Sequence, residues 1–291
     1  MENFSEIVVG LDISNNAKEV LSRAFLLAKR NDSNVTIAHA IDIGFFGNFI
    51  KDEKIEKLKT SAIKGIKKLL NGVDTQGLSY SIEVQKAKPS VFIMNIAKDR
   101  DACMIVIGAN EKKNFTTSVL GSTAHNIAQK SHLPLHLVKN NSSEAYKNIV
   151  AFTDLSEVSK KSILFSKEFF HQGSIKCVYA YKLMSDTDFA LKYNNDADNE
   201  VRVEIEKMIQ TQEQKKFDKF AKENNISDAE LIEDRVGVTN ALTNYVNTNG
   251  NDLVVLGSSG VNNTGALLYG STASSLMQSL KCDVLVYVPK E

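Results

Sequence analysis

The sequence predicts an α/β protein of two tandem, doubly wound domains, each built on a five-stranded parallel sheet. One observation is a repeat: Ile7-Val-Val-Gly-Leu-Asp12 returns as Ile149-Val-Ala-Phe-Thr-Asp154. Likewise, Met104-Ile-Val-Ile-Gly108 returns as Leu253-Val-Val-Leu-Gly257. The second observation is that short apolar runs alternate with segments of helical period, which is typical of βαβ units. The third is the length of 291 residues, which suits two domains of about 150 residues each.

Each element of the first half follows from this alternation. The apolar runs are continuous, as expected for strands covered by helices on both faces. In order, the expected elements are strand 6–11, helix 15–30, strand 34–41, helix 51–70, strand 80–85, helix 90–98, strand 103–108, helix 122–129 and strand 135–138. The second half repeats this order.

The second half also gains residues between its second and third strands, where 186–224 is expected to form a loop and a long helix. An apolar stripe along that helix predicts a face packed on its own sheet, and a face for a partner protein is the alternative. The stripe consists of Val201, Ile205, Met208, Ile209, Phe217 and Phe220.

The boundary between the two copies is expected in the polar segment Lys139–Lys147, which is rich in turn-forming residues. We therefore predict one domain over 1–140 and a second over 147–291. Asp154 follows Asp12 by 142 residues, and Gly257 follows Gly108 by 149.

Composition narrows the class of protein. The chain is 43% hydrophobic and 24% charged, with 35 basic and 35 acidic residues, which is typical of a globular protein and gives no overall attraction to nucleic acid. No apolar run reaches the ~18 residues that span a bilayer, so we expect a cytoplasmic protein with neither nucleic acid nor membrane as partner. The three cysteines lack metal-site spacing and are expected to be buried thiols.

A glycine-rich loop follows the fourth strand of the second half. Gly257-Ser-Ser-Gly260 is followed, after nine residues, by Gly270-Ser271-Thr272 at the start of a helix. We expect Gly257 and Gly260 to adopt positive φ and approach a ligand closely, and Gly270, Ser271 and Thr272 to present free N–H groups and hydroxyls. Such groups favour a phosphate.

Asp154 ends the first strand of the same half, which a doubly wound sheet places beside the fourth. Its carboxylate is expected to bind sugar hydroxyls or a base edge, flanked by Thr153 and the backbone at Ala180. The alternative is that the glycine loop is only a tight turn and helix cap, and that Asp154, or the equally placed Ser156, only caps a helix.

With Asp154, Gly257, Gly260 and Gly270-Ser271 in the spacing G-x2-G-x9-G-S, the whole chain resembles two copies of the universal stress protein family. The resemblance implies an adenine nucleotide alpha hydrolase-like fold that binds ATP, with Mg²⁺ on the phosphates. It implies a stress-response regulator or sensor with at most slow ATP hydrolysis, an unidentified protein partner and a homodimer. A nucleotide-free interaction scaffold of the same fold is the alternative.

The first copy departs from this pattern because Glu111 replaces the second glycine. A side chain and a negative charge there oppose phosphate binding, and Lys112 and Lys113 offset only the charge. Lys88 also stands where the second copy has Gly237. We therefore expect one nucleotide per chain, in the C-terminal half.

No G-x-S-x-G, H-E-x-x-H or Walker-type motif is present, so no catalytic residue and no metal ligand is predicted. His39, His132 and His136 lie in or beside predicted strands and are expected to be structural. A true enzyme of a related fold is a further alternative, which turnover assays with ATP would reveal.

The last strands of the two copies, Leu135–Val138 and Val284–Val288, are expected to pair with each other. The second is fully apolar, and an open sheet edge of that kind would promote aggregation. Duplication supplies the cover within one chain.

Overall fold

The computed structural model describes residues 4–13, 16–44, 50–109, 120–139, 144–171, 173–185, 187, 189, 199–258 and 270–289. The N-terminal half contains β1 (Glu6–Gly10), α1 (Ala17–Arg30), β2 (Asn34–Ile41), α2 (Asp52–Leu70), β3 (Tyr80–Lys86), α3 (Pro89–Asp99), β4 (Met104–Gly108), α4 (Ser122–Lys130) and β5 (Leu135–Val138). The C-terminal half contains β6 (Asn148–Thr153), α5 (Glu157–Phe169), β7 (Ser174–Lys182), α7 (Asn199–Glu223), β8 (Ala229–Asp234), α8 (Val238–Asn249), β9 (Leu253–Gly257), α9 (Ser271–Ser279) and β10 (Asp283–Tyr287).

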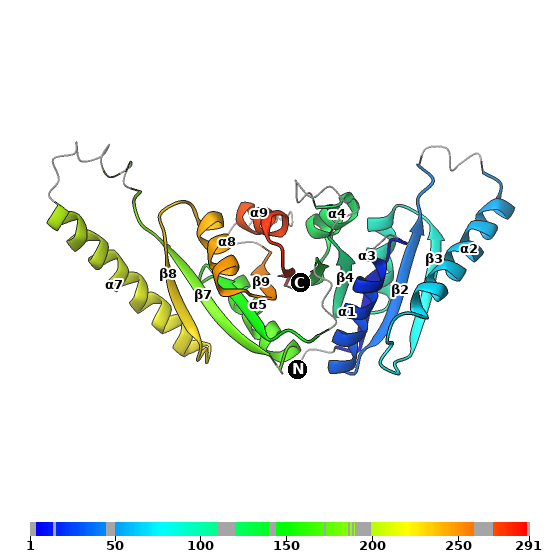
Figure 1. The fold of residues 1–291 in the computed structure, drawn as a ribbon, viewed down its shortest axis with the longest axis horizontal. Helices are drawn as coiled ribbons and strands as arrows, with labels where there is room; N and C mark the ends of the chain where they lie inside the picture. The colour runs from blue at the N-terminus through cyan, green and yellow to red at the C-terminus, as the bar shows by residue number, and fades with distance from the viewer. Residues whose placement is uncertain are drawn as a thin grey trace.

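These strands form one ten-stranded sheet with helices on both faces (Figure 1), in the order β3-β2-β1-β4-β5-β10-β9-β6-β7-β8. Within each half the five strands are parallel and doubly wound, so the predicted fold class is confirmed. The order reverses between β1 and β4 in one half and between β6 and β9 in the other. These are the positions at which open parallel sheets bind ligands.

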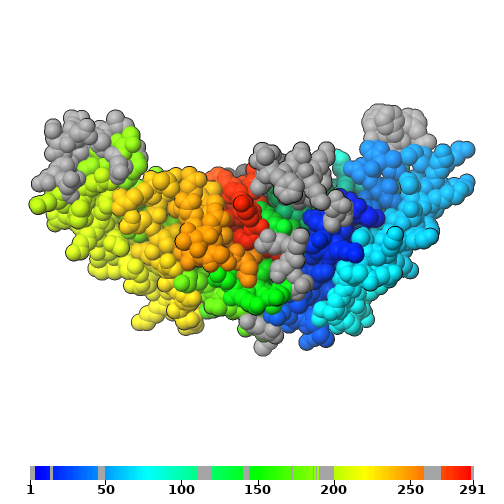
Figure 2. Space-filling model, viewed as in Figure 1, coloured from blue at the N-terminus to red at the C-terminus, as the bar shows by residue number. Residues whose placement is uncertain are grey.

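The two halves join through β5 and β10, which pair antiparallel at the centre of the sheet. Val284 pairs with Leu137, Leu285 with His136 and Val286 with Leu135. The predicted pairing of the last strands is therefore confirmed. In Figure 1 the N-terminal and C-terminal halves lie on opposite sides of this junction, and Figure 2 shows them meeting along the middle of the molecule.

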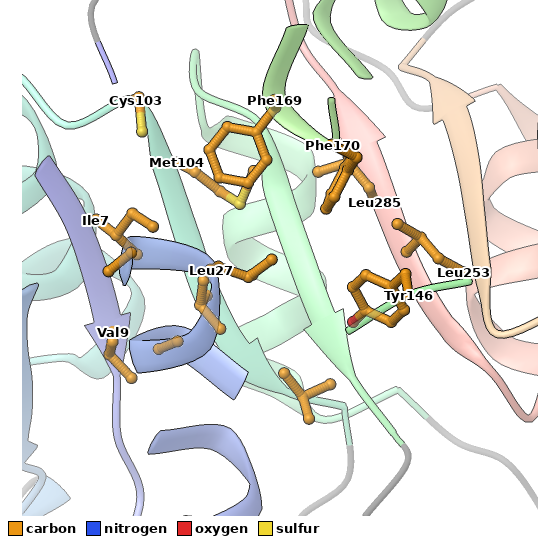
Figure 3. Packing of buried hydrophobic residues seen from close by; sticks show 14 of the residues in the cluster. Ile7, Val9, Leu27, Cys103, Met104, Tyr146, Phe169, Phe170, Leu253 and Leu285 are labelled. Atoms are coloured by element: carbon orange, nitrogen blue, oxygen red, sulfur yellow. The ribbon is translucent and has the colours of Figure 1, made fainter. Parts of the chain in front are cut away.

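Two hydrophobic cores lie on opposite faces of the sheet, and both run through the two halves. The first lies under α1, α2, α5 and α7, and the second under α3, α4, α8 and α9. In Figure 3, Leu27 and Met104 of the N-terminal half lie near Phe169, Phe170 and Leu285 of the C-terminal half. Because apolar burial drives folding, a core shared in this way makes each half depend on the other.

The long helix α7 packs on the sheet through its second part, where Phe217 and Phe220 are buried. Val201 and Met208, in its first part, are exposed. The predicted stripe therefore packs on its own sheet over only part of its length. Among the described residues, no helix has both the length and the apolar character required to cross a membrane.

Candidate functional site

A cavity of about 290 Å³ opens in the C-terminal half beyond the carboxyl ends of β6 and β9. Its described lining comes from the end of β6 and the turn after it, from α5 and α8, from the end of β9, and from the start of α9 with the residues next to it. These residues are Phe152, Thr153, Asp154, Ser156, Ser159, Val238, Leu242, Leu256, Gly257, Ser258, Gly270, Ser271, Thr272 and Ala273. The cavity therefore lies where the strand order reverses.

Six of the predicted site residues line this cavity: Thr153, Asp154, Gly257, Gly270, Ser271 and Thr272. Ala180 is not among the lining residues; it pairs with Ile232 within the sheet and packs against the second core. Gly260 and Glu111 lie outside the described residues.

Hydrogen bonds within the turn after β6 hold Thr153 and Asp154. Asp154 Oδ1 accepts from the backbone N–H of Ser156 at 3.0 Å, and Thr153 Oγ1 accepts from that of Leu155 at 2.9 Å. Ser156 is the N-cap of α5, because its Oγ accepts from the backbone N–H of Ser159 at 3.2 Å. Asp154 therefore does not cap the helix, and its exposed carboxylate has lone pairs for further donors.

Gly257 has a packing role that its place in the glycine motif does not indicate. Its φ is not positive, so the expectation of a positive φ at this glycine is wrong. A Cβ here would lie 3.1 Å from Val158 Cγ1 and 3.3 Å from Ser159 N. The missing side chain thus lets the first turn of α5 pack against the end of β9.

Gly270 is the N-cap of α9, with φ −55° and ψ 150°, so it also lacks positive φ. Its N–H donates to the carbonyl of Ser258 at 3.0 Å and is not free, contrary to expectation. The next N–H groups, of Ser271 and Thr272, belong to the first turn, which has no intrahelical acceptors for them.

Ser258 was not predicted as a site residue, although it lies within the glycine motif. It is buried, and its Oγ has no hydrogen-bond partner among the described residues. A buried hydroxyl without a partner costs free energy, so such a group in a cavity indicates a place for a ligand or water.

The N-terminal half has a larger cavity, of about 590 Å³, at the corresponding ends of β1 and β4. It is lined by Asp12, Ala40, Lys88 and the start of α4, among other residues. One difference is at the end of the first strand, where Gly10 stands in place of Phe152. The expectation that this half has a degenerate site depends on Glu111 and stays a prediction.

Among the residues that the structure describes, no group of three or more His, Cys, Asp or Glu side chains is placed to hold a metal ion. The three cysteines are buried thiols, as expected. Burial raises the pKa of Cys177 to about 12 and that of Cys282 to about 11.

Comparisons with known proteins agree with this architecture. The model of the "Universal stress protein family" matches residues 3–139 and again 145–288. The universal stress protein Sll1388 of Synechocystis is 26% identical over 42% of this chain and 88% of its own. The crystal structure of PA1789 from Pseudomonas aeruginosa, described as functionally unknown, has a TM-score of 0.70 at 15% identity and covers 99% of this chain and 93% of its own. A universal stress protein from Archaeoglobus fulgidus has a TM-score of 0.69 at 14% identity, with 100% of both chains covered.

Proposed function

Because the chain belongs to the universal stress protein family, whose model it matches twice, we propose that its C-terminal half binds ATP. Mg²⁺ would be carried on the phosphates, and turnover would at most be slow ATP hydrolysis. On this proposal the chain is a cytoplasmic regulator or sensor of the stress response.

The buried hydroxyl of Ser258 beside the N-terminus of α9 is the observation that carries the proposal. The N–H groups of a first helical turn attract anions, and the hydroxyls of Ser271 and Thr272 add further donors. Gly260 is proposed to bring the loop backbone close to the phosphates. A phosphate here would satisfy the Ser258 hydroxyl.

The other end of the cavity suits a nucleoside. Asp154 can accept hydrogen bonds from ribose hydroxyls, while Phe152, Leu242 and Leu256 provide an apolar wall for the base. Since Ala180 does not line the cavity, the base contact falls to this wall. The volume of about 290 Å³ lies just below the ~300–1,000 Å³ that is typical of small-molecule sites.

One observation favours a second candidate, in which the nucleotide binds in the N-terminal half. That cavity is the larger of the two and includes Asp12 and Lys88. Against it stands Glu111, whose carboxylate would repel phosphate. The alternative of a different functional class is an interaction scaffold that binds no nucleotide in either half.

Mass spectrometry of small molecules released from the denatured protein tests whether nucleotide is bound at all. We expect an adenine nucleotide near one equivalent per chain. Calorimetric titration of the emptied protein should use ATP, together with cAMP and dAMP, which two solved universal stress protein structures contain. If no nucleotide is released and none binds when it is added, the result would support the nucleotide-free scaffold.

Matched variants identify which half of the chain binds ATP. Ser258→Ala is expected to weaken ATP binding about tenfold, the effect of one hydrogen bond to a charged group. Asp154→Ala should also weaken it, whereas Asp12→Ala should not. Gly260→Glu, which copies Glu111, should remove most of the affinity. The opposite pattern for the two aspartates would place the nucleotide in the N-terminal half.

A further inference from the structure

A cluster of buried polar side chains lies where the two halves meet. Arg23 of α1 and His136 of β5 come from the N-terminal half, and Asp283 of β10 comes from the C-terminal half. Tyr146, just before β6, lies between them. All four side chains are buried. A charge in such a place is stable only when it is paired, so each half must supply what the other lacks.

The contacts in this cluster cross the junction. Arg23 Nε lies 3.4 Å from Asp283 Oδ2, and the guanidinium lies over the Tyr146 ring at 4.0 Å. The Tyr146 hydroxyl donates to Asp283 Oδ2 at 2.5 Å, and its oxygen lies 2.7 Å from His136 Nε2. Because the single hydroxyl proton goes to the carboxylate, His136 Nε2 donates to the Tyr146 oxygen. The backbone N–H of Lys139 donates to Asp283 Oδ1 at 2.7 Å.

The junction has an approximate two-fold symmetry, and the register locates its axis. His136 pairs directly with Leu285, which lies 149 residues further along the chain, the same offset as between Gly108 and Gly257. The two residues of this pair thus occupy equivalent positions in the two copies. Every position at the junction therefore has an equivalent position across the axis, as at an isologous interface.

The counterparts of the polar cluster are all apolar. With the same two offsets, Phe165 replaces Arg23, Phe4 replaces Tyr146, Leu285 replaces His136 and Pro134 replaces Asp283. The rings of Phe4 and Phe165 lie 5.6 Å apart, edge to face, and Phe165 lies 5.3 Å from Tyr287. One side of the junction is thus ionic and the other aromatic.

We propose that this asymmetry makes the junction selective, so that an N-terminal half accepts only a C-terminal half as its partner. Two N-terminal halves paired in the same way would bury two copies of Arg23 opposite Pro134, which stands at the position of Asp283 and brings no carboxylate of its own. Two C-terminal halves would bury two copies of Asp283 opposite Phe165, with no cation. The surface formed by β5 and α1 therefore fits a partner domain that has an acidic residue at the start of its last strand, as the C-terminal half has in Asp283.

Phe165→Arg in the intact chain tests this, because it gives the aromatic side the arrangement of two paired N-terminal halves. Phe165→Met is the matched control, which removes the ring without adding charge. We expect the equilibrium constant for unfolding in urea to be at least about a hundredfold higher for Phe165→Arg than for the control. Loss of a cooperative transition would count as the same result.

The second variant separates charge from packing. Phe165→Arg combined with Pro134→Asp places a carboxylate at the position equivalent to Asp283, and should recover at least about tenfold of the loss. The proposal is overturned if Phe165→Arg is no worse than Phe165→Met. It is equally overturned if adding Pro134→Asp recovers nothing, because the loss would then come from packing alone.

Discussion

Replacing Arg23 with methionine is expected to lower the free energy of unfolding by about 3 kcal/mol. The side chains of Arg23 and Asp283 are 1% and 0% exposed, so the substitution leaves a buried carboxylate without its cation. Removal of one partner of such a pair costs about 3–5 kcal/mol. The lower end applies, since the Lys139 N–H and the Tyr146 hydroxyl still donate to Asp283.

An exposed ion pair provides the control. Lys57 Nζ and Glu53 Oε1 are 2.7 Å apart, closer than Arg23 and Asp283, but their side chains are 74% and 77% exposed. Lys57→Met is therefore expected to change the free energy of unfolding by less than about 0.5 kcal/mol. These two variants distinguish whether burial or distance determines how much an ion pair contributes to the free energy of unfolding.

Urea unfolding followed by circular dichroism measures these effects for Arg23→Met, Asp283→Asn and the double variant. Because each single variant leaves one buried group without the opposite charge it faces in the folded protein, the double variant should lose at least about 1 kcal/mol less than the sum of the single losses. The reasoning is refuted if the two losses simply add, or if Arg23→Met costs no more than Lys57→Met.

Three other predictions concern the same framework. Burial lowers the pKa of His136 from 6.5 to about 4 in the folded chain. Between these values the unfolded chain binds a proton that the folded chain does not, so the stability falls as the pH is lowered through them. About 2 kcal/mol of stability should be lost between pH 7.5 and 5, and thermal melts of His136→Leu should show a weaker dependence of stability on pH. Val286→Lys buries a charge opposite Leu135 at the junction and should open both halves to limited proteolysis together, whereas cleavage of one half alone would contradict the shared cores. Gly257→Ala should cost about 1 kcal/mol in urea unfolding because its Cβ meets α5. Gly270→Ala should cost clearly less, since no atom of the described residues lies within 4 Å of its added Cβ; equal losses would mean that α5 readily shifts.

The fold could be predicted because its signals are local and occur twice. The continuous apolar run Met104-Ile-Val-Ile indicates a strand buried on both faces, and its counterpart Leu253-Val-Val-Leu repeats the signal. The junction followed from one further step, since the apolar strand at Val284 needed a cover. In each case the residue types along one segment were sufficient.

The details of the site could not be predicted, because they depend on segments that are distant in sequence. Gly257 is needed for the approach of α5, not for a positive φ. The N–H of Gly270 is used by the carbonyl of Ser258, and Ala180 does not line the cavity. A motif gives the residue types of a loop, whereas the partner of each polar group is decided by packing.

The polar cluster was also beyond prediction, although its members stand out in the sequence. His136 interrupts an apolar strand, and Asp283 begins another. Each was compatible with a solvent-facing position, and only the antiparallel register brings Asp283 to the Tyr146 hydroxyl that His136 also contacts. The pairing of strands could be inferred, but the side chains that meet across the junction could not.

Duplication within one chain explains how such a junction can exist. In a dimer of identical subunits, any substitution appears on both sides of the two-fold axis, so an arginine at the position of Arg23 would be buried twice and would need two carboxylates. Fusion removes this constraint, because each copy can change alone. Arg23 could then be paired by one carboxylate, Asp283, while the equivalent positions kept the aromatic packing of Phe4 and Phe165. The same freedom applies to the two cavities, where Gly10 and Phe152 differ at one equivalent position.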